Sequence, residues 1–184
     1  MIPPQSELFA PTDVETLPDD MRVASGYAAL AAALELSVAE VLPYLPTLDE
    51  HAAIVTVGDM AEALDMADRP FVRLTRFDPH IAHPNQLRGF GVSLWQHLGP
   101  WMDPTSPGFG TRGAHRHWTA FFRDQTGDPN AMPNVFDIFG DMPTQWLDHR
   151  SWRDVLLQTT QCRGATPVVH LQIIHPETEN PDGA

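Results

Sequence analysis

The chain has 184 residues, of which 42% are hydrophobic and 9% aromatic, a composition that excludes a disordered chain and predicts a globular protein. Its formal net charge of −13 argues against nucleic-acid binding, because proteins that bind nucleic acid neutralise phosphates with basic side chains. The chain has one cysteine, no apolar stretch long enough for a membrane span and no N-terminal secretion pattern, so we expect a single cytoplasmic domain over residues 1–184, with no membrane contact.

Three helices are predicted in the first 70 residues, each starting after a Ser or Thr that can cap its free N–H groups. An extended arm precedes them over residues 1–20, which contain four prolines. The first helix is rich in alanine, which favours close packing and predicts a buried central helix. The predicted helices and their capping residues are Ala28–Leu34 after Ser25, Val38–Leu45 after Ser37 and Met60–Ala67 after Thr56.

The rest of the chain predicts an antiparallel sheet. The irregular stretch 78–113 is predicted to contain one short helix at Val92–Leu98, another short helix begins at Ser151, and residues 176–184 form a flexible tail. Helices followed by antiparallel strands indicate the α+β class. Alternating or β-branched apolar runs predict four strands, which are Phe71–Phe77, His117–Phe122, Asn134–Phe139 and Thr166–Ile174.

Three residues in these elements form a candidate catalytic set: Ser25 at the start of a helix, and His117 and Asp137 on neighbouring strands. A nucleophile at a helix N-terminus, a histidine base and a carboxylate that holds the base are the parts of a hydrolase triad. Ser25 is also explained as a plain N-cap, and His117 as a packed core residue. Asp137 needs a partner on its apolar strand, because burying an unpaired carboxylate is costly.

The segment Ser25-Gly-Tyr-Ala-Ala-Leu-Ala resembles the Cys-Gly-x-x-Ala-Leu-Ala start of the central helix in papain-like cysteine peptidases. His117-Trp-Thr-Ala-Phe and Phe136-Asp-Ile-Phe-Gly140 resemble the His-Trp and Asp strands of these enzymes and, more closely, of the ubiquitin-like-protein proteases. The resemblance covers about residues 23–140. It implies a papain-like α+β fold, with an N-terminal central helix packed against an antiparallel sheet.

The resemblance also implies a thiol hydrolase or acyl transferase that acts on amide or isopeptide bonds of a peptide or protein. Ser25 would stand at the nucleophile position, with His117 as base, Asp137 as orienting residue and Asn134 as the alternative orienting residue. Serine is a poorer nucleophile than cysteine, so we expect an inactive or weak site. The oxyanion glutamine of the family is also missing, and acidic residues stand before the helix instead.

Other interpretations stay open at this stage. Cys162 follows His117 and Asp137 in the order used by the ubiquitin-like-protein proteases, although a strand is predicted after it where that family has a helix. The acidic charge favours instead a non-catalytic protein that binds a basic partner, of the immunity, antitoxin or pseudo-peptidase kind. All eleven basic residues are arginine, so the chain cannot be conjugated through lysine, which would suit a component of a conjugation system.

Three tryptophans, Trp95, Trp101 and Trp118, are candidates for lining a substrate cleft beside His117. We expect no metal and no cofactor. Histidines recur at His115 and His117, but no HExxH motif or cysteine cluster accompanies them. The glycines of the irregular stretch lack the Lys-Ser/Thr of a phosphate-binding loop.

Overall fold

A computed structural model describes residues 8–17, 21–45, 55–75, 84–99, 116–124, 128, 130–138, 145–160 and 162–174. The predicted tail 176–184 lies outside the described residues, and so do residues 78–83 and 100–113 of the irregular stretch, with Trp101 among them, and His115. Of the predicted arm, the structure describes residues 8–17, which contain one short 3-10 helix, η2 (Val14–Thr16).

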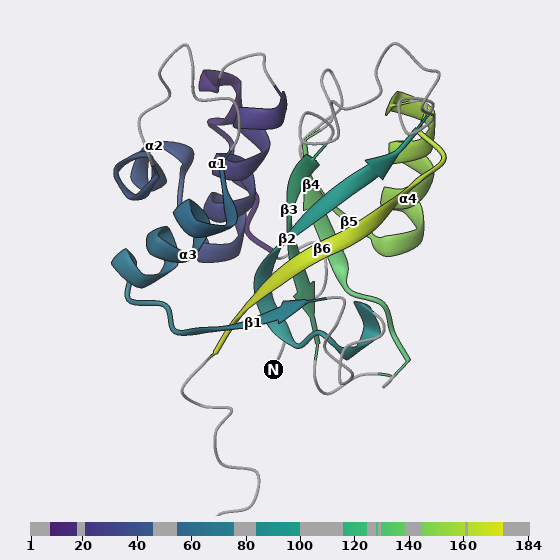
Figure 1. The fold of residues 1–184 in the computed structure, drawn as a ribbon. Helices are drawn as coiled ribbons and strands as arrows, with labels where there is room; N and C mark the ends of the chain where they lie inside the picture. Colours follow the sequence, from purple (N-terminus) through teal and green to yellow (C-terminus); the bar gives the residue numbers. More distant parts are fainter. Residues whose placement is uncertain are drawn as a thin grey trace, which may run out of the picture.

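The described helices lie on both faces of a sheet (Figure 1). The first three gather on one side, and α4 covers the other side. Their bounds are α1 (Met21–Leu34), α2 (Val38–Val41), α3 (Val57–Met66) and α4 (His149–Thr160), with short 3-10 helices η3 (Leu42–Tyr44) and η4 (Pro84–Gln86). This arrangement confirms the predicted α+β class and the N-terminal helix packed against an antiparallel sheet.

The sheet has six strands in the order β1-β6-β2-β3-β4-β5, and every neighbouring pair is antiparallel. The register places Trp95 opposite His117, and Ala120 opposite Phe136. The β4 segment therefore lies beside the strand that carries His117. The strands are β1 (Phe71–Thr75), β2 (Gly89–Leu98), β3 (Arg116–Arg123), β4 (Asn134–Asp137), β5 (Gln145–Asp148) and β6 (Gly164–Ile173).

The short helix predicted at Val92–Leu98 is wrong, because these residues belong to β2. This strand is central, and both of its faces are covered: Val92 and Leu94 pack in the core beneath α1, whereas Trp95 packs in the core beneath α4. A strand that is apolar on both faces loses the alternation that distinguishes a strand from a buried helix. The strand β5 is absent from the sequence prediction.

Two of the three predicted N-caps are present. The hydroxyls of Ser37 and Thr56 accept the N–H groups of Glu40 and Asp59 at 3.3 and 3.1 Å. Ser25 is not an N-cap, because α1 begins at Met21 and Ser25 lies in its second turn. The residues that precede Ser25 include the good helix formers Met, Arg and Ala, which let the helix extend upstream.

The core between α1 and the sheet depends on small side chains in the helix. Six consecutive residues from Ala28 to Ala33 are alanine apart from Leu30, and all of them are buried. Small side chains bring the helix backbone close to β3, which supplies Trp118, Ala120 and Phe122 to the same cluster. The helix is thereby fixed against the strand that carries His117.

Among the described residues, no single helix has the length and hydropathy needed to cross a membrane. Ala24–Leu34 and Val38–Tyr44 reach those values only when taken together, and the two segments meet at an angle of 101°.

Gly91 of β2 lies where two neighbours leave no room for a side chain. A Cβ there would collide with the backbone carbonyl of Leu171 on β6 and would approach the Phe121 ring to 2.5 Å. We expect Gly91→Ala to lower the free energy of unfolding by about 2 kcal/mol, because a backbone atom cannot move aside cheaply. Urea denaturation measures the loss. Gly58→Ala is the matched control, since its Cβ would meet only Thr56 Oγ1 at 3.5 Å, and an equal loss there would contradict the steric explanation.

Candidate active site

The site lies at the start of β3, where His117 meets the carboxylate of Asp137 from the end of β4. His117 Nε2 is hydrogen-bonded to Asp137 Oδ1, and both side chains are almost fully buried, with 6% and 0% of their surface exposed. The two residues lie diagonally across the β3–β4 pair, since Ala120 faces Phe136. Neighbouring strands therefore bring together two residues that are 20 positions apart in the sequence.

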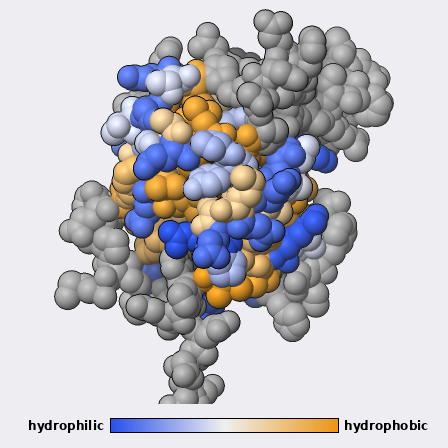
Figure 2. All heavy atoms as spheres, turned by 90° about the vertical axis from the view of Figure 1, so that its left-hand side faces the viewer, coloured by the Kyte–Doolittle hydropathy of each residue, from blue (hydrophilic) through white to orange (hydrophobic). Residues whose placement is uncertain are grey.

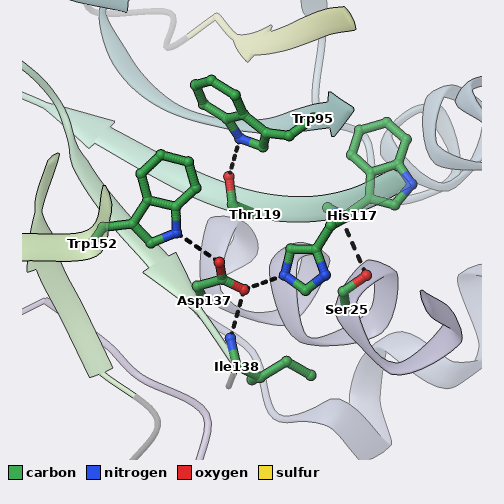
Figure 3. Close-up of polar contacts among 8 residues, drawn as sticks. Ser25, Trp95, His117, Thr119, Asp137, Ile138 and Trp152 are labelled. Atoms are coloured by element: carbon green, nitrogen blue, oxygen red, sulfur yellow. Dashed lines mark hydrogen bonds and ion pairs between the residues drawn. The ribbon is translucent and has the colours of Figure 1, made fainter. Parts of the chain in front are cut away.

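Asp137 is held by three hydrogen-bond donors. Besides His117, the backbone N–H of Ile138 donates to Oδ1 at 2.7 Å, and the indole N–H of Trp152 donates to Oδ2 at 2.6 Å. Both carboxylate oxygens thus accept hydrogen bonds, which offsets part of the cost of burying the group. Figure 3 shows the Trp152 indole and the His117 ring approaching Asp137 from different sides.

This arrangement fixes which nitrogen of His117 can act as a base. Because Nε2 faces the carboxylate, the contact favours the tautomer that donates from Nε2, and in that tautomer Nδ1 is the acceptor. In Figure 3 the ring lies between Asp137 and Ser25, with its second nitrogen on the side of Ser25. A proton acceptor is therefore directed toward the residue 25 side chain.

Ser25 lies next to His117 but is set into the helix. Its Oγ accepts the backbone N–H of Trp118, the residue after His117, at 3.2 Å, and the residue is 1% exposed. Only the first four N–H groups of an α-helix lack a partner within the helix, and Ser25 is the fifth residue of α1. Its own N–H thus belongs to the hydrogen-bond pattern of the helix.

Two residues near the pair are not identified by the sequence analysis. In the sequence, Trp152 falls in a predicted short helix and His97 in a segment predicted as helical. The His97 ring packs against the His117 ring, with the ring centroids 5.4 Å apart and the ring planes inclined by 33°. The residues come from α4 and β2, so no local motif connects them to His117. The helix that carries Trp152 begins at His149, two residues before the predicted start at Ser151, and the Asp148 carboxylate accepts the N–H groups of Arg150 and Ser151.

The tryptophans predicted to line a cleft are core residues where the structure describes them. Trp95 donates its indole N–H to Thr119 Oγ1 at 2.9 Å, and Trp118 donates to the carbonyl of Val55 at 2.8 Å. Both are buried, because each side of the sheet is covered by helices. Neither of them offers an open surface to a substrate in this structure, and Trp101 lies outside the described residues.

The alternative site residues lie elsewhere. Cys162 is buried in the apolar cluster beneath α4, together with Leu156, and the strand β6 follows it where a nucleophile would need a helix. Asn134 begins β4 opposite Phe122, five positions along β3 from His117, or about 16 Å at the rise of a strand. Its side chain therefore cannot replace Asp137 as the partner of His117.

Two further histidines surround the aromatic cluster under α4. Burial lowers the pKa of His149, and the positive charge of Arg153 lowers it further. Burial lowers the pKa of His170 to about 4. Both rings are thus neutral at pH 7. No group of three or more His, Cys, Asp or Glu side chains in the described ranges is arranged to hold a metal ion.

Comparison with known proteins finds no matching family model and no matching curated protein. Among solved structures, the chain is similar to the peptidase domain of Streptococcus ComA, a bi-functional ABC transporter involved in a quorum sensing pathway. The alignment has a TM-score of 0.44 and 12% identity, and it covers 85% of this chain and 93% of that domain.

Proposed function

We propose that this protein has the site of a papain-like hydrolase or acyl transferase that acts on amide or isopeptide bonds. In this site Ser25 stands at the nucleophile position, His117 is the base and Asp137 is the orienting residue. The serine makes it weak or inactive as it stands. The observation that supports this most is the buried His117–Asp137 pair beside Ser25. A buried pair of a histidine and a carboxylate is costly to maintain for stability alone. In the proposed site this pair turns Nδ1 of His117 toward the Ser25 hydroxyl.

The proposed chemistry follows from these positions. The residue 25 side chain attacks the carbonyl carbon of a peptide or protein substrate and passes its proton to Nδ1 of His117. The histidine then gives that proton to the leaving amine, and an acyl-enzyme remains until water or another amine takes the acyl group. Asp137 keeps Nε2 protonated and stabilises the imidazolium. Serine limits the first step, because a hydroxyl ionises far less readily than a thiol.

Restoring the thiol tests the proposal. We expect Ser25→Cys, in a Cys162→Ala background, to react with iodoacetamide at pH 7 about tenfold faster than an unperturbed thiol, because a neighbouring histidine favours the thiolate. Mass spectrometry of the alkylated protein measures the rate. The matched control is the same protein with His117→Gln, which should lose the gain. Equal rates with and without His117, or no amide cleavage by the Ser25→Cys protein, would contradict the catalytic role.

A second candidate function has an observation of its own in favour. Ser25 is buried and serves as acceptor for the N–H of Trp118, as a purely structural serine would. The helical side of the molecule, seen in Figure 2 with hydrophilic residues among hydrophobic ones, is acidic. Its exposed acids on described residues are Glu15, Glu35, Glu40, Glu62, Asp65 and Asp68, with Arg69 as the exposed base among them.

That surface fits a non-catalytic protein that binds a basic partner. The two functions are separable by one pair of measurements. A Ser25→Cys protein that is unreactive but still forms a salt-sensitive complex with a basic protein would favour binding, since surface charge attraction falls with ionic strength. A reactive Ser25→Cys protein with no such complex at low salt would favour the hydrolase.

A further inference from the structure

Helix α4 contributes one side chain to the candidate site, and that side chain is Trp152. The residue is 2% exposed, and its indole N–H donates to Asp137 Oδ2 at 2.6 Å. The donors on this carboxylate therefore come from three places in the fold: β3, the backbone after β4, and α4 on the far face of the sheet. The hydrolase proposal does not use the contact with α4.

The two carboxylate oxygens of Asp137 have separate partners. Oδ1 accepts from His117 and from the backbone of Ile138, whereas Oδ2 accepts from Trp152. Rotation about the last side-chain torsion of an aspartate is soft, so a bond to only one oxygen leaves the plane of the group loosely defined. The bond to Oδ2 fixes that plane. Without it, a fully buried oxygen would lack a donor, and the carboxylate plane would be free to turn.

Trp152 packs against a second tryptophan. Trp95 packs against it with ring centroids 4.9 Å apart and an inclination of 46°. The indole N–H of Trp95 donates to Thr119 Oγ1 on β3 at 2.9 Å. The two indoles thus join α4 to β2 and β3, and Figure 3 shows both of them on the same side of the His117–Asp137 pair.

We propose that Trp152 is a positioning residue for His117. By holding Oδ2 of Asp137, it keeps Oδ1 aligned with Nε2–H of His117 and leaves Nδ1 turned toward residue 25. The value of this alignment for catalysis rests on the proposed function. The alignment itself is a property of the resting protein, and it is measurable without any turnover.

The experiment compares two matched substitutions, Trp152→Phe and Trp95→Phe. Each removes one buried indole N–H from the same aromatic pair, but only Trp152 donates to Asp137. The first readout is the proton NMR signal of His117 Nε2–H, which is assigned by its loss in His117→Gln. We expect Trp152→Phe to shift this signal by more than about 1 ppm or to lose it through exchange with water, and Trp95→Phe to retain it.

The second readout is kinetic. In the Ser25→Cys, Cys162→Ala protein, we expect Trp152→Phe to reduce the alkylation rate about tenfold, since a charge-assisted bond that aligns the base is lost. Trp95→Phe should change that rate less than twofold. If Trp152→Phe does not fold, 3-benzothienylalanine at position 152 serves instead, because it replaces the N–H by sulfur at nearly constant ring size.

The proposal would be overturned if the His117 Nε2–H signal were unchanged in the variant that lacks the Trp152 N–H. It would also be overturned if Trp152→Phe and Trp95→Phe changed that signal equally. The NMR result does not depend on activity. A different outcome is that the His117 Nε2–H signal is lost only when the Trp152 N–H is removed, while the Ser25→Cys variant is unreactive. That pair of results would support the positioning role and contradict the hydrolase function. The two proposals can therefore fail separately.

Discussion

Replacing Asp137 by asparagine should destabilise the protein by about 3 kcal/mol, although the two side chains have nearly the same shape. A carboxylate accepts hydrogen bonds on both oxygens, whereas an amide accepts on one side and donates on the other. Here both sides face donors: His117 and Ile138 on one, Trp152 on the other. Whichever way the amide is turned, its NH₂ group meets an N–H, and buried donors lose their acceptor.

The contact with Trp152 makes the effect of Asp137→Asn testable by a double-mutant cycle. If the amide NH₂ turns toward position 152, Trp152→Phe removes the opposing N–H. The double variant Asp137→Asn/Trp152→Phe should then be more stable than the sum of the single losses predicts, by about 1–2 kcal/mol. Urea denaturation at pH 7 supplies the four free energies of unfolding.

A control separates this effect from the loss of a negative charge. Asp65→Asn removes one charge on an exposed part of α3, and its stability should change by less than about 0.5 kcal/mol. The interpretation would be wrong if Asp137→Asn were equally harmless, or if the losses of Asp137→Asn and Trp152→Phe were additive. In the Ser25→Cys protein, we also expect Asp137→Asn to remove most of the accelerated alkylation, because the base is no longer held.

The contact between His117 and Asp137 is predictable from the sequence, because it follows from the cost of burying an unpaired carboxylate and from the order of two strands. A carboxylate on an apolar strand needs a partner, and the hairpin-like order of two strands suggests His117 as that partner. The register of β3 and β4 depends on alternation that the sequence carries in Ala120, Phe122 and Phe136. The adjacency of Ser25 comes from the family resemblance rather than from any such pattern.

What the sequence does not disclose depends on packing across the sheet. Ser25 looks like an N-cap because a serine before an alanine run has that local signature, yet the helix starts at Met21 and uses the hydroxyl for the backbone of β3. Trp152 has no local signature at all, since its role requires α4 to lie on a particular face. The prediction for Val92–Leu98 fails for a related reason, because a strand buried on both faces shows no period.

The second large effect concerns His170, a buried residue of β6 that takes no part in the proposed chemistry. Its Nδ1 is hydrogen-bonded to Ser93 Oγ at 2.6 Å, and its ring packs edge-on against Trp95 and Phe121, each with centroids 6.0 Å away. Burial lowers the pKa of His170 from its ordinary value of 6.5 to about 4. The folded protein thus prefers the neutral ring, and at about 1.4 kcal/mol per pH unit this preference corresponds to about 3 kcal/mol.

The sign follows from proton uptake. Above pH 6.5 the ring is neutral in both states, and the stability that it confers is complete. Between pH 6.5 and about 4, the unfolded chain binds a proton that the folded protein does not, so the free energy of unfolding falls as the pH is lowered. Below about 4 the folded protein is protonated as well, and the loss reaches its limit.

We therefore expect the advantage of the native protein over Ser93→Ala/His170→Leu to shrink by about 2–3 kcal/mol between pH 7 and pH 4.5. Both proteins share all other titrating groups, so their difference isolates His170. Ser93→Ala alone keeps the histidine and should keep the acid sensitivity. Urea denaturation at the two pH values gives the answer, and parallel losses in all three proteins would refute the assignment.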